Sequence, residues 1–257
     1  LFATATPRTY SSTVHKAAEE CGVEVVGMDN AALFGEVLYA LPFGKAIERK
    51  LLTDYRVVII GVDDPTIAQW IAKRELVSFS PLPPPGEGRD EGAQDKFHQQ
   101  EKQLSQTRQT DSESLAAQIG LLKAIKDYDL KRIISFHSRV KRAEEFTSDI
   151  QNTMQWVGDE HRPSGTLHTD FVSGNMSANK RKIKLDQLKA MRTNERGVLS
   201  NARCLSEGVD VPSLDGVAFI DPRSSQVDII QAVGRAIRLS PDKKAGTIVL
   251  PVFIAIG

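Results

Sequence analysis

Apolar residues recur along most of this chain in two alternating patterns. Short β-branched runs are typical of strands, and stretches whose apolar residues recur every three or four positions are typical of helices. Strands are predicted at 23–26, 55–62, 132–137, 166–172, 197–201, 217–220 and 246–254. Helices are predicted at 12–21, 43–52, 65–76, 112–128, 138–150, 177–191 and from about 225. This alternation predicts an α/β fold with a mostly parallel sheet and helices on both faces.

Local signals refine several of these elements. Gly22 is predicted to close the first helix at its C′ position, and Ser225 with Asp228 fits a capping box at the start of the last one. The run YRVVIIGV at 55–62 predicts a buried strand. Residues 80–111 are rich in proline, glycine, glutamine and charge, which predicts a mobile polar loop.

Composition narrows the class of protein. The chain has 257 residues, 40% of them hydrophobic, and its 33 basic and 33 acidic residues cancel. Zero net charge argues against a purely electrostatic nucleic-acid binder but allows a local basic groove. The five histidines lack metal-ligand spacing, so no metal site is expected. Cys21 and Cys204 are expected to be buried free thiols in a reducing compartment.

The sequence was also searched for a membrane span and a signal peptide. No apolar run approaches the roughly 20 residues that span a bilayer, and the first residues lack the layout of a signal peptide. We therefore expect a cytoplasmic protein without membrane contact. The first residue is not methionine and lies within an apolar stretch, which indicates a fragment whose upstream part is missing.

The segment QAVGRAIR, residues 231–238, carries the most specific chemistry. On a helix, Gln231, Arg235 and Arg238 fall on one side, opposite an apolar stripe. Two guanidinium groups one turn apart can bind an oxyanion such as phosphate. Glycine within a helix is less stable than alanine by roughly 1 kcal/mol. The presence of Gly234 therefore predicts a close neighbour that needs the space a side chain would fill. The alternative is a solvated basic face without chemistry.

Four segments occur in an order that resembles a known family. They are ATAT (3–6), IISFHS (133–138), LSNARCLSEGVDVP (199–212) and QAVGRAIR. Their order and spacing resemble motifs III, IV, V and VI of superfamily 2 helicases of the DEAD/DEAH type. Within that superfamily the chain is most similar to double-stranded-DNA translocases, including the motor subunits of restriction enzymes. Residues 34–62 also resemble the segment that leads into the second motor domain of that branch.

The resemblance implies a RecA-like domain of the P-loop NTPase type. Such motors hold ATP and Mg²⁺ between two RecA-like domains, and the first domain carries the phosphate loop and acidic box. Neither GxxxxGK[ST] nor a DExH or DExD box is present here. Residues 41–257 would therefore be the second domain, and residues 1–40 a remnant of the first with its connector.

The resemblance also assigns roles in ATP hydrolysis. Arg235 and Arg238 would act as arginine fingers on the γ-phosphate. Gln231 would bond near the same phosphate or link it to the DNA side. Gly208 would let the backbone approach the nucleotide, and Asp210 would bind the ribose or a motif VI arginine. A strand-to-loop turn with a surface aspartate is the alternative for this last pair.

DNA would lie across the carboxyl ends of the strands. Ser138, Arg139, Ser200 and Asn201 would contact its backbone there, without sequence specificity. An N-cap without a DNA contact is the alternative for Ser138, and both interpretations stay open. Thr4 and Thr6 would couple the nucleotide state to translocation. The basic residues at the start of the 177–191 helix could add to the groove or be plain surface: Lys180, Arg181, Lys182 and Lys184.

These observations predict the C-terminal motor half of an ATP-dependent DNA helicase or translocase. The full-length protein would hydrolyse ATP with its N-terminal RecA-like domain, and this fragment alone would be inactive. One alternative is a non-catalytic α/β module that binds nucleic acid or phosphate. Another is an α/β enzyme whose arginines and Asp210 bind a phosphorylated metabolite.

Overall fold

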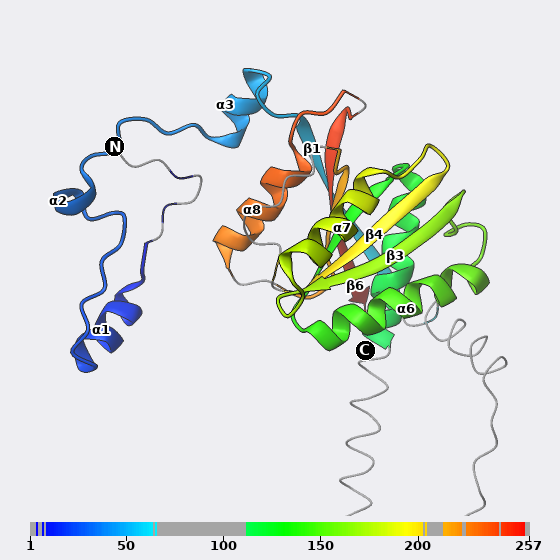
Figure 1. Ribbon diagram of the computed structural model, residues 1–257, viewed down its shortest axis with the longest axis horizontal. Coiled ribbons are helices and arrows are strands. Elements are labelled where there is room, and N and C mark those ends of the chain that lie inside the picture. The colour runs from blue at the N-terminus through cyan, green and yellow to red at the C-terminus, as the bar shows by residue number, and fades with distance from the viewer. Residues whose placement is uncertain are drawn as a thin grey trace, which may run out of the picture.

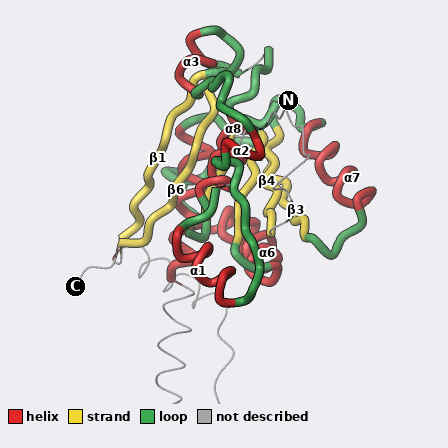
Figure 2. Tube along the Cα trace, turned by 90° about the vertical axis from the view of Figure 1, so that its left-hand side faces the viewer, coloured by secondary structure: helices red, strands yellow, loops and turns green. Residues whose placement is uncertain are grey.

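A single parallel sheet forms the centre of the computed structural model, which describes residues 4, 7, 9–63, 65, 112–202, 204, 213–222, 225–241 and 243–254. Its strands are β1 (Asp54–Asp63), β2 (Arg132–His137), β3 (Thr166–Ser173), β4 (Glu195–Ala202), β5 (Gly216–Phe219) and β6 (Ala245–Ile254). The six strands lie in the order β1-β6-β5-β2-β4-β3, and every neighbouring pair is parallel. Figure 2 shows β1 and β6 at one edge, with β4 and β3 toward the other. The predicted α/β class is confirmed.

Helices cover both faces of this sheet. The helices of the described residues are α1 (Ser12–Glu20), α2 (Ala31–Phe34), α3 (Phe43–Glu48), α6 (Val140–Trp156), α7 (Ala178–Lys189) and α8 (Gln226–Ala236), and residues 112–127 form another. One buried cluster joins helix 112–127 and α6 to the sheet through residues such as Ile125 and Ile150. A second cluster joins α7 and α8 to the other face, through residues such as Leu188 and Ile237. Figure 1 shows α1 and α2 beyond α8, away from the sheet.

Most predicted elements are confirmed within a few residues, and the exceptions have local causes. The first helix ends as predicted: Gly22 has φ +67°, and the N–H of Val23 donates to Ala18 O at 2.9 Å. The strand predicted at 23–26 does not form. The helix predicted at 43–52 ends at Glu48, because Lys50 takes φ +56° and turns the chain toward β1. Within 65–111, only Pro65 belongs to the described residues.

The β1 strand is only half buried, which corrects the prediction of a buried strand. Its alternate residues Val58, Ile60 and Val62 pack against the first core. Tyr55 and Ile59, on the opposite face, are exposed, with Ile59 at 68%. A β-branched run predicts a strand but does not distinguish an edge strand from a central one. The exposed face borders a cavity of about 600 Å³ that α8 and Phe43 also line.

Both cysteines are free, but the prediction that they are buried is wrong for Cys21. Cys21 is exposed at the end of α1, and Cys204 is half-buried after β4. Among the described residues, no helix is long and apolar enough to cross a membrane.

Candidate nucleotide and nucleic-acid site

The helix α8 presents the QAVGRAIR segment. Its N-cap Ser225 accepts a hydrogen bond from the N–H of Asp228 at 3.3 Å, which is one half of the predicted capping box. Ala232, Val233, Ala236 and Ile237 are buried against β5 and β6 in the second core. Ile230 is 40% exposed, so the predicted apolar stripe is only partly packed. The packing fixes which side of α8 the polar residues occupy.

The three polar residues of this segment differ in their surroundings. Arg235 is buried, with 7% of its surface exposed, whereas Gln231 and Arg238 are half-buried. The helix ends at Ala236, and Ile237 is its C-cap. Arg238 therefore follows the helix, and its N–H donates to Arg235 O at 3.4 Å. The prediction that both arginines lie on one continuous helix is therefore wrong for Arg238.

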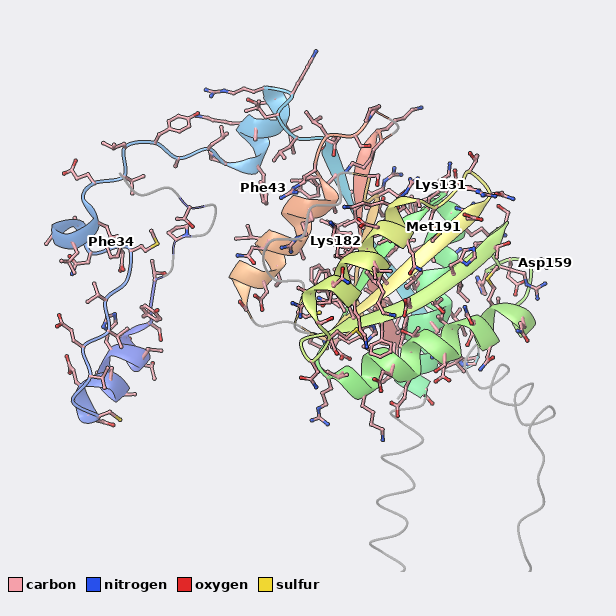
Figure 3. The ribbon with its side chains drawn as sticks, viewed as in Figure 1. Phe34, Phe43, Lys131, Asp159, Lys182 and Met191 are labelled. Carbon is pink, nitrogen blue, oxygen red and sulfur yellow. The ribbon has the colours of Figure 1, made fainter. Side chains whose placement is uncertain are left out.

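The space around Gly234 is open among the described residues. A Cβ atom added there would meet only Phe43 Cζ, at an ordinary contact distance of 3.8 Å. Figure 3 shows Phe43 of α3 near the end of α8 that adjoins β1. The described part of the chain thus has room for alanine at this position and does not supply the close neighbour that we expected.

The turn between β2 and α6 is held by a buried carboxylate. The N–H and the hydroxyl of Ser138 both donate to Asp221 Oδ2, each at 2.7 Å. The Arg142 guanidinium lies 3.0 Å from Asp221 Oδ1, and Asp221 is only 4% exposed. The N-cap of α6 is Arg139, not Ser138, and it is exposed. Arg139 is therefore the accessible cation of this turn.

Ser200 and Asn201 lie at the matching end of β4 but face the interior. Ser200 is fully buried, and its hydroxyl lies 3.2 Å from Ser135 Oγ and 2.9 Å from Thr147 Oγ1. The side-chain oxygen of Asn201 accepts from the N–H of Cys204 at 3.2 Å. Both side chains have partners within the domain and lie behind the surface that carries Arg139.

Sequence reasoning missed the polar network beneath this edge. His137 is 1% exposed, and its Nε2 lies 3.0 Å from Ser135 Oγ. The same hydroxyl lies beside Ser200, so the network joins β2, β4 and α6. Polar residues at the carboxyl ends of two predicted strands were the available signal. Asp221 had a similar signal, because it follows the predicted strand at 217–220.

The remaining predicted site residues are placed only in part. Thr4 is described and exposed, whereas Thr6, Gly208 and Asp210 lie outside the described residues. At the start of α7, Lys180 and Lys182 are exposed. Figure 3 labels Lys182 on this helix. The other two basic residues predicted for the groove are half-buried: Arg181 donates to Gly174 O at 3.4 Å, and Lys184 lies 2.5 Å from Asp170 Oδ1.

The site shows no sign of an activated nucleophile or metal centre in the described part of the chain. Burial raises the pKa of the Cys204 thiol, and the nearby Arg181 only partly opposes this. A raised pKa keeps the thiol protonated and unreactive. No cluster of histidine, cysteine or acidic residues suited to a metal ion occurs among the described residues. The exposed cations Arg139, Lys180 and Lys182 suit phosphate oxygens.

Comparison with known proteins places this geometry in a family. Residues 117–240 match the family model of the helicase conserved C-terminal domain. The ATP-dependent Type ISP restriction-modification enzyme LlaBIII, solved bound to DNA, has 27% identity and a TM-score of 0.66 over 90% of this chain and 14% of its own. A fragment described as the HsdR subunit of a type I restriction enzyme from Vibrio vulnificus YJ016 shares the fold, with a TM-score of 0.55 and 18% identity over 89% of this chain and 38% of its own.

A shorter match comes from a protein described as a helicase in African swine fever virus. It is 42% identical over 60 residues, which cover 23% of this chain and 7% of the viral protein. The chain thus spans a small part of the proteins that it resembles. Residues 117–240 thus match the helicase conserved C-terminal domain, and the parallel sheet has the RecA-like fold of such domains.

Proposed function

We propose that this chain is the second motor domain of an ATP-dependent DNA helicase or translocase. Its partner is a first RecA-like domain of the same protein, outside this sequence, which binds ATP and Mg²⁺. The main support is α8, which carries the half-buried Gln231 and the buried Arg235 beside a parallel sheet. The similar structure LlaBIII is an ATP-dependent restriction-modification enzyme.

The chemistry of α8 fits one wall of a nucleotide cleft. Arg235 and Arg238 carry fixed positive charge, and Gln231 adds an amide, so the three side chains suit a polyphosphate. The described residues hold no metal-ligand cluster, so the Mg²⁺ ligands belong to the other domain in this proposal. In the same proposal, Gly208 and Asp210 also contact the nucleotide.

The packing of Arg235 is relevant to its proposed role. A guanidinium on a helix backed by Val233 and Ile237 loses little further freedom when it meets phosphate. Such preorganised charge stabilises the transition state more than mobile charge does. In other phosphoryl-transfer enzymes an arginine finger is worth roughly 10³- to 10⁵-fold in rate. Arg235 is the rigid member of this pair, and Arg238, beyond the helix end, is the more accessible one.

The proposed DNA contacts lie where α6 and α7 begin. Each helix follows a parallel strand, β2 or β3, so both helix N-termini lie at the carboxyl edge of the sheet. Helix N-termini favour anions such as phosphate. Arg139 caps α6, and Lys180 and Lys182 lie in the first turns of α7. We assign these three exposed cations to the DNA backbone, with Ser138, Ser200 and Asn201 shaping the edge from behind. Thr4 and Thr6 remain the proposed coupling residues.

The experiment that tests this function compares the chain with the full-length protein. ATP hydrolysis is measured for residues 1–257 and for the whole protein, each with and without duplex DNA. The full-length protein should hydrolyse ATP faster when DNA is added, whereas the isolated chain should bind ATP weakly and not turn it over. DNA-stimulated hydrolysis by the isolated chain would refute the shared cleft. Sugar-phosphate binding without any effect of DNA on the full-length protein would favour the metabolite enzyme instead.

A further inference from the structure

The carboxylate of Asp221 joins two loops that the proposed function uses separately. Asp221 lies directly after β5, four residues before the N-cap of α8. Its three donors all come from the region after β2: the N–H and hydroxyl of Ser138 and the guanidinium of Arg142. One buried acid therefore ties the turn that presents Arg139 to the segment that leads into α8.

The backbone reinforces this connection. The N–H groups of Ile220 and Asp221 donate to Phe136 O at 3.2 and 3.4 Å. These bonds continue the contact between β2 and β5 beyond their last paired residues, Phe136 and Phe219. Arg139 follows Ser138 directly in the chain, with an extended backbone (φ −134°, ψ 149°). The position of the Arg139 backbone thus depends on where Asp221 holds Ser138.

We propose that Asp221 is a positioning residue that holds the Arg139 turn in fixed register with α8, so that DNA bound at the turn stimulates hydrolysis. This inference rests on the proposed function. A neutral amide at position 221 cannot replace the carboxylate, because its NH₂ group would face either the Ser138 donors or Arg142. The turn and α8 would then no longer be held together.

A matched control lies at the opposite end of β5, the strand that Asp221 follows. Asp215, directly before β5, is a half-buried carboxylate, and it accepts from the N–H groups of Lys131 and Arg132 at 3.0 and 2.8 Å. It lies at the amino edge of the sheet, away from the Arg139 turn. Asp215→Asn should therefore lower stability much as Asp221→Asn does, without the same effect on DNA stimulation.

The experiment uses the full-length protein and measures the ratio of the ATPase rate with saturating duplex DNA to the rate without DNA. Asp221→Asn should lower this ratio about tenfold and Ser138→Ala about threefold, whereas Asp215→Asn should keep it within twofold of wild type. The Ser138→Ala effect should be smaller in the Asp221→Asn background, because both substitutions break the same contact between Ser138 and Asp221. Thermal unfolding, measured in parallel, reports the stability of each variant.

Three outcomes would overturn this inference. The first is an unchanged ratio in Asp221→Asn, and the second is an equal loss in Asp221→Asn and Asp215→Asn. The third is additive behaviour of Ser138→Ala and Asp221→Asn. Each of these would leave the proposed function intact, provided that wild type is stimulated by DNA. Absence of stimulation in wild type would instead refute the proposed function and this inference with it. If Asp221→Asn fails to fold, the Ser138→Ala ratio alone decides.

Discussion

Salt dependence offers the most quantitative test of the proposed DNA surface. Each protein cation that neutralises a phosphate releases condensed counterions, and the slope of log K against log salt changes by about 0.9 per contact for B-DNA. Arg139, Lys180 and Lys182 are exposed at the carboxyl edge of the sheet. The triple alanine variant should therefore have a slope that is shallower by about 2.7.

The same principle gives the change in affinity. A fourfold increase in salt is about 0.6 in log units, so each lost contact should reduce the salt-induced drop in K by roughly 3.5-fold. Lys184 should contribute little, because it is half-buried and paired with Asp170. The assay is fluorescence anisotropy of a labelled duplex with the full-length protein, titrated between 50 and 200 mM salt.

The matched control is Arg192→Ala. Arg192 is exposed like Arg139, but it lies between α7 and β4, at the amino edge of the sheet. Its variant should have the wild-type slope. A triple variant with an unchanged slope, or a control that shifts the slope as much as one of the three cations, would refute the placement of DNA at the carboxyl edge.

Three further predictions concern the domain itself. Gly246→Ala should lower the free energy of unfolding, measured by urea denaturation, by about 2 kcal/mol. The reason is that the new Cβ would lie 2.3 Å from the carbonyl oxygen of Ala236, the last residue of α8. Gly174→Ala is the control, because a Cβ at that position would have no atom within 4 Å. Arg196→Met should cost about 3 kcal/mol, because the buried guanidinium donates to two backbone carbonyls and two side chains; Arg192→Met should be neutral by the same measurement. Burial lowers the pKa of Lys243 to about 8 from 10.5. The unfolded chain then holds this proton more tightly than the folded one, so stability relative to Lys243→Met should rise from pH 8 to pH 10.5 in unfolding measurements, and a difference that falls with pH would contradict the lowered pKa.

Local signals were sufficient to predict most of the secondary structure. The strand at 132–137 was predicted to the residue, since a β-branched run lies between a basic start and a polar end. The helix predicted at 138–150 continues to Trp156, because its polar last turns show little apolar periodicity. The end of α3 at Glu48 had no sequence signal, since a lysine rather than a glycine takes the positive φ.

The site was less predictable because its contacts are non-local. The partner of Ser138 is Asp221, 83 residues away in sequence, and no spacing rule links the two. Ser200 and Asn201 were correctly placed at a strand end, but which way a strand-end side chain points depends on its neighbours in the sheet. The helix α8 was predictable because a single 3.6-residue period carries both its packing and its polar face.

The most direct test of the shared cleft is single-turnover ATP hydrolysis by the full-length Arg235→Ala variant at saturating DNA. If Arg235 stabilises charge on the transferred phosphoryl group, the rate should fall by about 10³-fold or more, while the Kd for duplex DNA stays within about twofold of wild type. Arg235→Lys should restore little of the rate, because an ammonium cannot reproduce the planar guanidinium. A rate for Arg235→Ala within about tenfold of wild type would contradict the assignment of this arginine to the γ-phosphate.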